Sequence, residues 1–395
     1  MKSAPDRPIS SLPTAGDSGG RVPFYAWAAA LAVSAAVLGV QWDIAWHRSI
    51  GRDTFWSPPH LAIYLGGVLA GLSCGYLILR TSFNRSAAGG QGRDAAVRVW
   101  GFHGPLGAFL SVWGGWAMLA SAPFDDWWHN TYGLDVTILS PPHTVLALGI
   151  VAVELGGLLL LTGARNQARG PARGLLTVLF FAVGGLLLVG LLTFEMEFTG
   201  RVLQHGATFY CAVAVVAPMV LIGVGRASGH RWGITLTAAV YSAVLLLLLW
   251  LLPLMPATPK LGPVYFQTTH LVPEGFPLLL LASALAMDLA QPALAARPPF
   301  WQAAVLGVLF IAGLLAAQWP MADFLMSPAA RNWVFGSHYR SYDAQAHWTS
   351  VRNIYTVTEP STSAFFVRLA AAFVISIVST RVGIGWAGFL RQLRR

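Results

Sequence analysis

The chain has few charged residues and few cysteines. Only 10% of its 395 residues are charged, whereas 55% are hydrophobic. Soluble domains carry about 25% charged residues, so this composition excludes an ordinary soluble domain. The two cysteines, Cys74 and Cys211, lie within apolar segments and form no CxxC or CxxH pair. The sequence therefore predicts no disulfide and no zinc-finger or iron–sulfur site, and any metal is expected to have nitrogen and oxygen ligands.

Apolar stretches long enough to cross about 30 Å of hydrocarbon recur along the chain. We predict an all-α fold, a polytopic transmembrane helical bundle of about ten spans. The expected spans are 24–46, 59–80, 102–123, 142–163, 174–194, 207–225, 233–254, 273–290, 300–319 and 363–380. The polar residues 1–23 are expected to form a disordered cytoplasmic tail.

Basic residues are unequally divided between the two faces that this topology defines. The face opposite the termini holds only Arg48, Arg52, Arg201, Lys260, Arg331, Arg340 and Arg352, and most other basic residues lie on the side of the termini. We therefore expect a multi-pass protein of the bacterial inner membrane with both termini in the cytoplasm. The net charge of +9 then belongs to cytoplasmic loops facing membrane lipid, and no nucleic-acid partner is expected.

Two segments repeat one set of polar residues. Residues 43–60 read DIAWHRSIGRDTFWSPPH and residues 125–143 read DDWWHNTYGLDVTILSPPH. In each, an Asp precedes a His by four residues, a second Asp follows six residues later, and the segment ends in Ser-Pro-Pro-His. The members are Asp43, His47, Asp53 and His60 in the first copy, and Asp125, His129, Asp135 and His143 in the second.

The spacing predicts that three side chains of each copy meet. Asp43 and His47 are four residues apart and share one face of a helix end, while Pro58-Pro59 favours the start of the next helix just before His60. One carboxylate with two imidazoles suits Cu(II), Fe(II) or Zn(II). We expect a duplicated helix-hairpin unit whose metal ligands are Asp43, His47 and His60, and then Asp125, His129 and His143.

Further polar residues are weaker candidates. Arg52, Asp53 and Asp135 are expected to orient the ligands by hydrogen bonds. Additional ligands or a proton path are a hypothesis for Glu195, Glu197 and His205 after the fifth span, and for His270 and Glu274 at the start of the eighth; ordinary interface polarity is the alternative. Glu154 lies in the middle of the fourth span, where a charge is costly.

The first motif resembles the metal-binding stretch of the C subunit of the copper membrane monooxygenases, the family of particulate methane and ammonia monooxygenases. The matching residues are Asp43, Trp46, His47, Ile50, Arg52, Asp53, Thr54, Pro58 and His60. The resemblance implies that Asp43, His47 and His60 bind copper. The family's second site has a carboxamide, a His four residues on and a His fourteen beyond that. Here this spacing is met by Asp125, His129 and His143, with Asp125 in place of Asn.

The resemblance covers roughly residues 24–165, which we interpret as a four-helix duplicated metal-binding region. Residues 166–319 are expected to add transmembrane helices, 320–362 to form a periplasmic loop, and 363–395 to form the last helix and a basic cytoplasmic tail. The family's enzymes combine three different subunits, so other membrane subunits or an electron donor are the expected partners.

Three functions follow from these features. The first is a subunit of a copper-dependent monooxygenase that uses O₂ to hydroxylate a small apolar molecule or ammonia. The second is a non-catalytic protein that stores, delivers or senses copper on the periplasmic side. The third is an ion- or proton-coupled transporter, although both motifs are expected at helix ends and transporter sites usually lie near the midplane.

Overall fold

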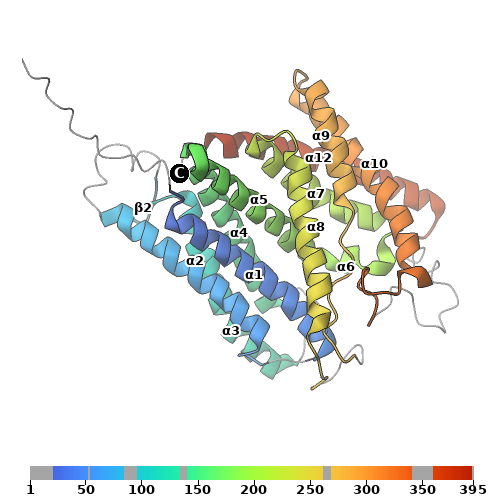
Figure 1. The fold of residues 1–395 in the computed structure, drawn as a ribbon, viewed down its shortest axis with the longest axis horizontal. Coiled ribbons are helices and arrows are strands. Elements are labelled where there is room, and N and C mark those ends of the chain that lie inside the picture. The colour runs from blue at the N-terminus through green and yellow to red at the C-terminus, as the bar shows by residue number, and fades with distance from the viewer. Residues whose placement is uncertain are drawn as a thin grey trace, which may run out of the picture.

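The computed structural model describes residues 21–51, 54–83, 96–133, 140–260, 268–339 and 359–393. The described residues are 79% helical and form a bundle of long helices (Figure 1). The one sheet among them has two short strands. This confirms the predicted all-α, membrane-like fold.

The first four long helices follow one another as two hairpins. Their bounds are α1 (Phe24–Ser49), α2 (Pro58–Phe83), α3 (Leu106–Tyr132) and α4 (Pro141–Gln167). Between the hairpins, β1 (Val97–Val99) pairs antiparallel with β2 (Phe102–Gly104). The third span was predicted to begin at residue 102, but that position is in β2, and the helix begins only after Pro105. Proline without an N–H group is well suited to precede a helix start, where no intrahelical acceptor is available.

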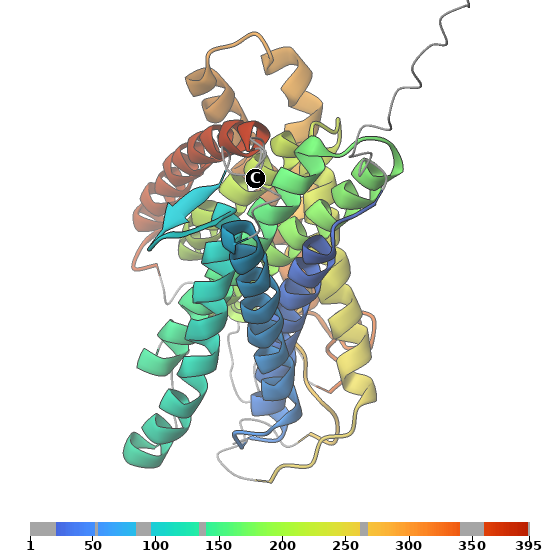
Figure 2. The same cartoon turned by 90° about the vertical axis from the view of Figure 1, so that its left-hand side faces the viewer.

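The second half of the chain adds six long or medium helices and several single turns. The bounds are α5 (Gly170–Phe194), α6 (Met196–Thr199), η2 (Arg201–Leu203), α7 (Ala207–Ser228), α8 (Gly233–Leu251), η3 (Leu252–Leu254), α9 (Leu280–Leu294), α10 (Pro299–Leu325), η4 (Pro328–Ala330) and α12 (Thr362–Gln392). Helix α5 packs against α1 and α4 on one side and against α7 and α8 on the other. It therefore joins the two hairpins to the rest of the bundle, while α12 lies along α7 and α10 (Figures 1 and 2).

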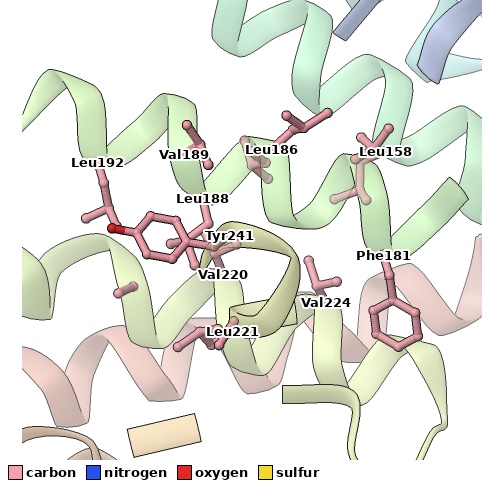
Figure 3. Close-up of a cluster of buried hydrophobic side chains, with 14 of the residues drawn as sticks. Leu158, Phe181, Leu186, Leu188, Val189, Leu192, Val220, Leu221, Val224 and Tyr241 are labelled. Carbon is pink, nitrogen blue, oxygen red and sulfur yellow. The ribbon is translucent and has the colours of Figure 1, made fainter. Parts of the chain in front are cut away.

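The core lies where α5 meets its neighbours. Leu158 of α4, Phe181 and Leu186 of α5, Leu221 of α7 and Tyr241 of α8 gather there (Figure 3). These side chains are buried, whereas the outer surfaces of the helices also carry large hydrophobic side chains. Helices that are apolar all round are typical of membrane spans, because lipid replaces water at their outer surface.

Close glycine contacts bring each hairpin together. A Cβ at Gly39 of α1 would lie 3.0 Å from the backbone nitrogen of Ile63 in α2, and a Cβ at Gly114 of α3 would lie 2.5 Å from the carbonyl oxygen of Gly149 in α4. Small residues allow helix backbones to approach closely in membranes. The close approach positions the helix ends so that a side chain from one helix reaches the next.

Among the described residues, eight helices are long and apolar enough to cross a membrane, and they coincide with eight of the ten predicted spans. The other two predicted spans correspond to α3 and α9. Helix α3 has 27 residues but is not among the eight, and α9 has only 15. The chain is therefore a multi-pass membrane protein by the length and composition of its helices, and the count of ten stays a prediction.

The lower ends of both hairpins lie at the same end of the bundle (Figure 2). The end of α1 and the start of α2 meet there, as do the end of α3 and the start of α4. We call this the hairpin end. Residues 1–20 of the predicted disordered tail and residues 340–358 of the predicted periplasmic loop lie outside the described residues, and α10 continues to Leu325.

Candidate metal centres

The first predicted ligand set meets at the tip of the α1–α2 hairpin. Asp43 and His47 lie on successive turns at the end of α1, and His60 is the third residue of α2. Helix α2 begins at Pro58, which has no N–H group to leave without an acceptor. Because α2 begins at Pro58, His60 lies in its first turn, beside the end of α1. We call Asp43, His47 and His60 the first triad.

The aspartate lies between the two imidazoles. The Oδ2 atom of Asp43 is 3.6 Å from Nε2 of His47, and its Oδ1 atom is 3.5 Å from Nε2 of His60. The side chain of His47 is 44% exposed, whereas those of Asp43 and His60 are 20% and 17% exposed. The triad therefore combines a partly shielded carboxylate with one imidazole that solvent reaches.

The second predicted set meets in the same way at the tip of the α3–α4 hairpin. Asp125 and His129 are on successive turns near the end of α3, and His143 is the third residue of α4. Ser140 caps α4, since its hydroxyl accepts a hydrogen bond from the backbone N–H of His143 at 3.4 Å. The cap fixes where α4 begins and hence where His143 projects. We call Asp125, His129 and His143 the second triad.

One oxygen of Asp125 serves both imidazoles of the second triad. Its Oδ1 atom is 3.3 Å from Nε2 of His129 and 3.3 Å from Nε2 of His143. The other ring nitrogen of His129, Nδ1, is 3.1 Å from the carbonyl oxygen of Gly133. A hydrogen bond from Nδ1–H to this carbonyl would leave Nε2 without a proton, the form in which imidazole binds a metal.

The distances within both triads fit a metal ion. Two ligand atoms that each lie about 2.1 Å from a metal at a tetrahedral angle are about 3.4 Å apart. A direct hydrogen bond between an imidazolium and a carboxylate would be about 2.8 Å long. The observed 3.3–3.6 Å separations match the first value, and all ligand atoms of each triad lie within 4.8 Å of one another. Within the described ranges, these two triads are the groups of three or more His, Cys, Asp or Glu that can hold a metal ion in this way.

The residues predicted to orient the ligands, Arg52, Asp53 and Asp135, lie outside the described residues. Tyr64 is an aromatic neighbour of the first triad. The ring of Tyr64 is 5.9 Å from that of His60, and its hydroxyl donates a hydrogen bond to the carbonyl oxygen of Phe55 at 3.0 Å. Tyr64 therefore links α2 to the loop between α1 and α2.

The candidates after the fifth span do not join one another as a ligand set. Glu195 follows the last residue of α5 and Glu197 lies in α6, whereas His205 precedes α7. Burial raises the pKa of Glu195 to about 8. The Nε2 atom of His205 lies 3.3 Å from Oδ1 of Asp323, a residue of α10. Sequence reasoning missed this pair, because its members are 118 positions apart in the chain and Asp323 belongs to no repeated motif.

The expectation that His270 and Glu274 share the start of a helix is wrong. Helix α9 begins only at Leu280, so neither residue lies in a helix. His270 instead stacks on Tyr339, with ring centroids 4.6 Å apart. Glu274 forms an ion pair with Arg48 of α1, with Oε1 2.8 Å from Nη2.

This ion pair belongs to a wider contact between α1 and residues 268–279. Arg48 also donates to the carbonyl oxygen of Pro273 at 3.3 Å, and the hydroxyl of Ser49 accepts from the backbone N–H of Val272 at 2.7 Å. The segment thus braces α1 immediately beyond His47. Sequence periodicity gives no signal for such a contact, since it joins a helix end to a segment without regular structure.

Comparisons with known proteins do not assign the chain. No family model matches it, and no curated protein or solved structure matches it either. The two triads and the helical membrane architecture are therefore the observations on which a function can be argued.

Proposed function

We propose that this protein is an integral membrane copper-binding protein that acts as a subunit of an O₂-dependent monooxygenase, resembling the C subunit of the copper membrane monooxygenases. The geometry of the two triads carries the proposal, because the aspartate oxygens and imidazole nitrogens lie 3.3–3.6 Å apart, farther than in a short charge-assisted hydrogen bond, and all ligand atoms of each triad lie within 4.8 Å of one another, close enough to reach one metal ion. The donor set of one carboxylate and two imidazoles suits copper, with iron or zinc as the alternatives.

The chain's own residues supply the ligands and the surroundings. Asp43 and Asp125 each place a negative charge between two imidazoles, which offsets the charge of a bound cation. Bound copper would supply the capacity to activate O₂ with electrons from a separate donor. The lipid-facing apolar helices would give a small apolar substrate access from the bilayer to the hairpin end. Asp125 in place of the family's Asn makes the second triad more negative, and therefore favours a more highly charged cation.

Metal analysis of the purified full-length protein in detergent tests the metal assignment. We expect one copper ion per triad in the wild type. His47→Ala and His129→Ala should each lose the metal of one triad, and the double variant should lose both. His103→Ala is the matched control, since His103 lies in β2, away from both triads. Equal metal content in the wild type and the double variant would show that the triads do not bind metal.

Oxygen uptake by the copper-loaded protein tests the catalytic part. With a reductant and its partner subunits, uptake should rise on addition of short alkanes or ammonia and fall in the two histidine variants. Copper-loaded protein that consumes no oxygen in the assembled complex would refute the monooxygenase assignment and leave the copper assignment intact.

A second candidate function is storage, delivery or sensing of copper. It is favoured by the exposure of one imidazole in each triad, 44% for His47 and 34% for His143, which would allow a metal to be passed to another protein. Rapid, complete transfer of copper to an acceptor chelator, without oxygen consumption, is the result expected for this function. A transporter fits less well, since both triads lie at helix ends.

We place the hairpin end on the periplasmic side on the basis of the basic residues near the termini. Trp56→Cys at an exposed position of the first hairpin should react with a membrane-impermeant maleimide in intact cells. His230→Cys, between α7 and α8, should react only after the cells are opened. The reverse pattern would show the opposite orientation.

A further inference from the structure

Glu154 is an acidic side chain in the middle of helix α4, and it is 0% exposed. It neighbours Gly190 of α5, where a Cβ atom would lie 2.9 Å from Cδ of Glu154 and 3.0 Å from its Oε2. The carboxyl group therefore occupies the space that the absent glycine side chain leaves between α4 and α5. Leu158, one turn further along α4, and Val189 and Leu192, close to Gly190 in the sequence of α5, belong to the buried apolar cluster of Figure 3.

No described residue balances this carboxyl group. Neither oxygen of Glu154 has a hydrogen-bond partner among the described residues, and none of their basic side chains lies within ion-pair distance of it. The helices packed against α4 are α1, α3, α5 and α12. Their titratable and charged residues are Tyr25, Asp43, His47, Arg48, Asp125, Asp126, His129, Tyr132, Arg173, Arg368, Arg381 and Arg391, and His143 and Arg165 lie on α4 itself. None of them forms a hydrogen bond or ion pair with Glu154.

Such surroundings strongly favour the protonated form. Transfer of an ionised carboxylate into an apolar interior without a partner is so costly that the group takes up a proton instead. The neutral carboxylic acid costs far less, because only its hydrogen bonds to water are lost. An acid at this position therefore holds a proton inside the bundle.

Polar side chains lead from Glu154 toward the hairpin end. Thr193 is three residues after Gly190, on the same face of α5, and its hydroxyl accepts a hydrogen bond from the amide of Gln41 at 2.7 Å. Gln41 lies on α1 and is only 3% exposed. Glu195, with its raised pKa of about 8, follows at the end of α5. In the other direction the neighbours on α4 and α5 are leucines such as Leu158 and Leu186 (Figure 3).

We propose that Glu154 is a proton-binding site in the interior of the bundle, filled and emptied from the hairpin end past Thr193 and Gln41. In the filled state the carboxyl carries the proton. In the emptied state the proton has passed to water at the hairpin end, and the carboxylate remains. The proposal concerns no metal ligand and stands whether or not the triads bind copper.

Infrared spectroscopy of the full-length protein in detergent tests the site, because a protonated carboxylic acid has a carbonyl band that a carboxylate lacks. We expect a wild-type band that shifts in D₂O and weakens as pH rises, and Glu154→Gln should remove the contribution of Glu154 to this band. Glu195, whose pKa is about 8, contributes a band of its own, so Glu195→Gln is the matched control and should leave the Glu154 contribution in place. Gln41→Leu should slow the D₂O shift without removing the band.

Labelling of the wild type keeps the test valid if Glu154→Gln does not fold. A hydrophobic carbodiimide reacts with protonated buried carboxyls, so mass spectrometry should find the adduct on Glu154 at low pH and less of it at high pH. The proposal is overturned if Glu154 gives neither band nor adduct, which means that it is ionised. It is equally overturned if the band changes with neither pH nor D₂O, which means that the proton never exchanges.

Discussion

Replacement of Asp125 by Asn removes the charge that the two imidazoles of the second triad share. The Oδ1 atom of Asp125 lies 3.3 Å from Nε2 of both His129 and His143, so this one atom lies next to both imidazoles. Asparagine keeps the shape of the side chain and a carbonyl oxygen, but it has no negative charge. Asp125→Asn therefore isolates the electrostatic contribution of the carboxylate to metal binding.

The expected loss of affinity is large. Changes in residues that only orient metal ligands lower metal affinity by about 10–100-fold. Neutralising a ligand itself should cost at least the upper value, about 100-fold or about 2.7 kcal/mol at 25 °C. The first triad lies on the other hairpin, on α1 and α2, and its affinity should stay unchanged.

Copper titration against a competing chelator of known affinity measures both sites in one experiment. The wild type should bind at two sites, and Asp125→Asn should retain tight binding at one of them. Asp126→Asn is the matched control, because Asp126 is the exposed neighbour of Asp125 and accepts a hydrogen bond from Asn130 at 3.3 Å. If Asp126→Asn lowers the affinity as much as Asp125→Asn, the loss reflects general charge, and the reasoning from the triad geometry is wrong.

Three further changes test the packing. Burial raises the pKa of Glu195 in the folded chain to about 8, so the folded chain keeps a proton that the unfolded chain releases near pH 4.5. Stability in detergent should therefore fall as pH rises between about 5 and about 8, and Glu195→Gln should flatten this dependence. A double-mutant cycle of Arg48→Met and Glu274→Gln, followed by thermal unfolding, should give a coupling free energy of about 1 kcal/mol, and zero coupling would mean that the 2.8 Å pair does not brace α1. Gly114→Ala should destabilise the protein by about 1–3 kcal/mol, because the added Cβ atom would meet the backbone of α4. Gly71→Ala should leave the stability unchanged, because no atom lies within 4 Å of the added Cβ atom, and equal effects of the two changes would contradict the close packing of α3 on α4.

The positions of the ligands within each hairpin were predictable from spacing. Asp43 and His47 are four residues apart in a long apolar helix, and Pro58 marks where the next helix begins. Helical periodicity and the preference of proline for a first turn therefore suffice to bring His60 to the same place. The start of the third helix was not predictable in this way, because residues 102–104 pair as β2 with β1, and this pairing depends on a second segment of the chain.

The eighth predicted span shows why hydropathy alone is insufficient. The segment 273–279 is mostly apolar, but it contains Pro273 and Pro277 and its backbone contacts other elements instead of forming a helix. Leu279 donates to Gln318 of α10 at 2.8 Å, and Pro273 accepts from Arg48 of α1. Contacts between distant segments decided this conformation, and no local pattern specifies them.

The sequence by itself determined the helical membrane class and the composition of both triads, because apolar length, helical periodicity and ligand type are local properties of the chain. The tertiary structure decided that the ligand atoms of each triad lie within 4.8 Å of one another, close enough to hold a metal ion. It also decided that Glu154 meets Gly190 without a balancing charge, and that Glu274 pairs with Arg48 rather than with His270. These contacts depend on which helix faces pack together, and the packing of distant segments is not encoded in any short stretch of sequence.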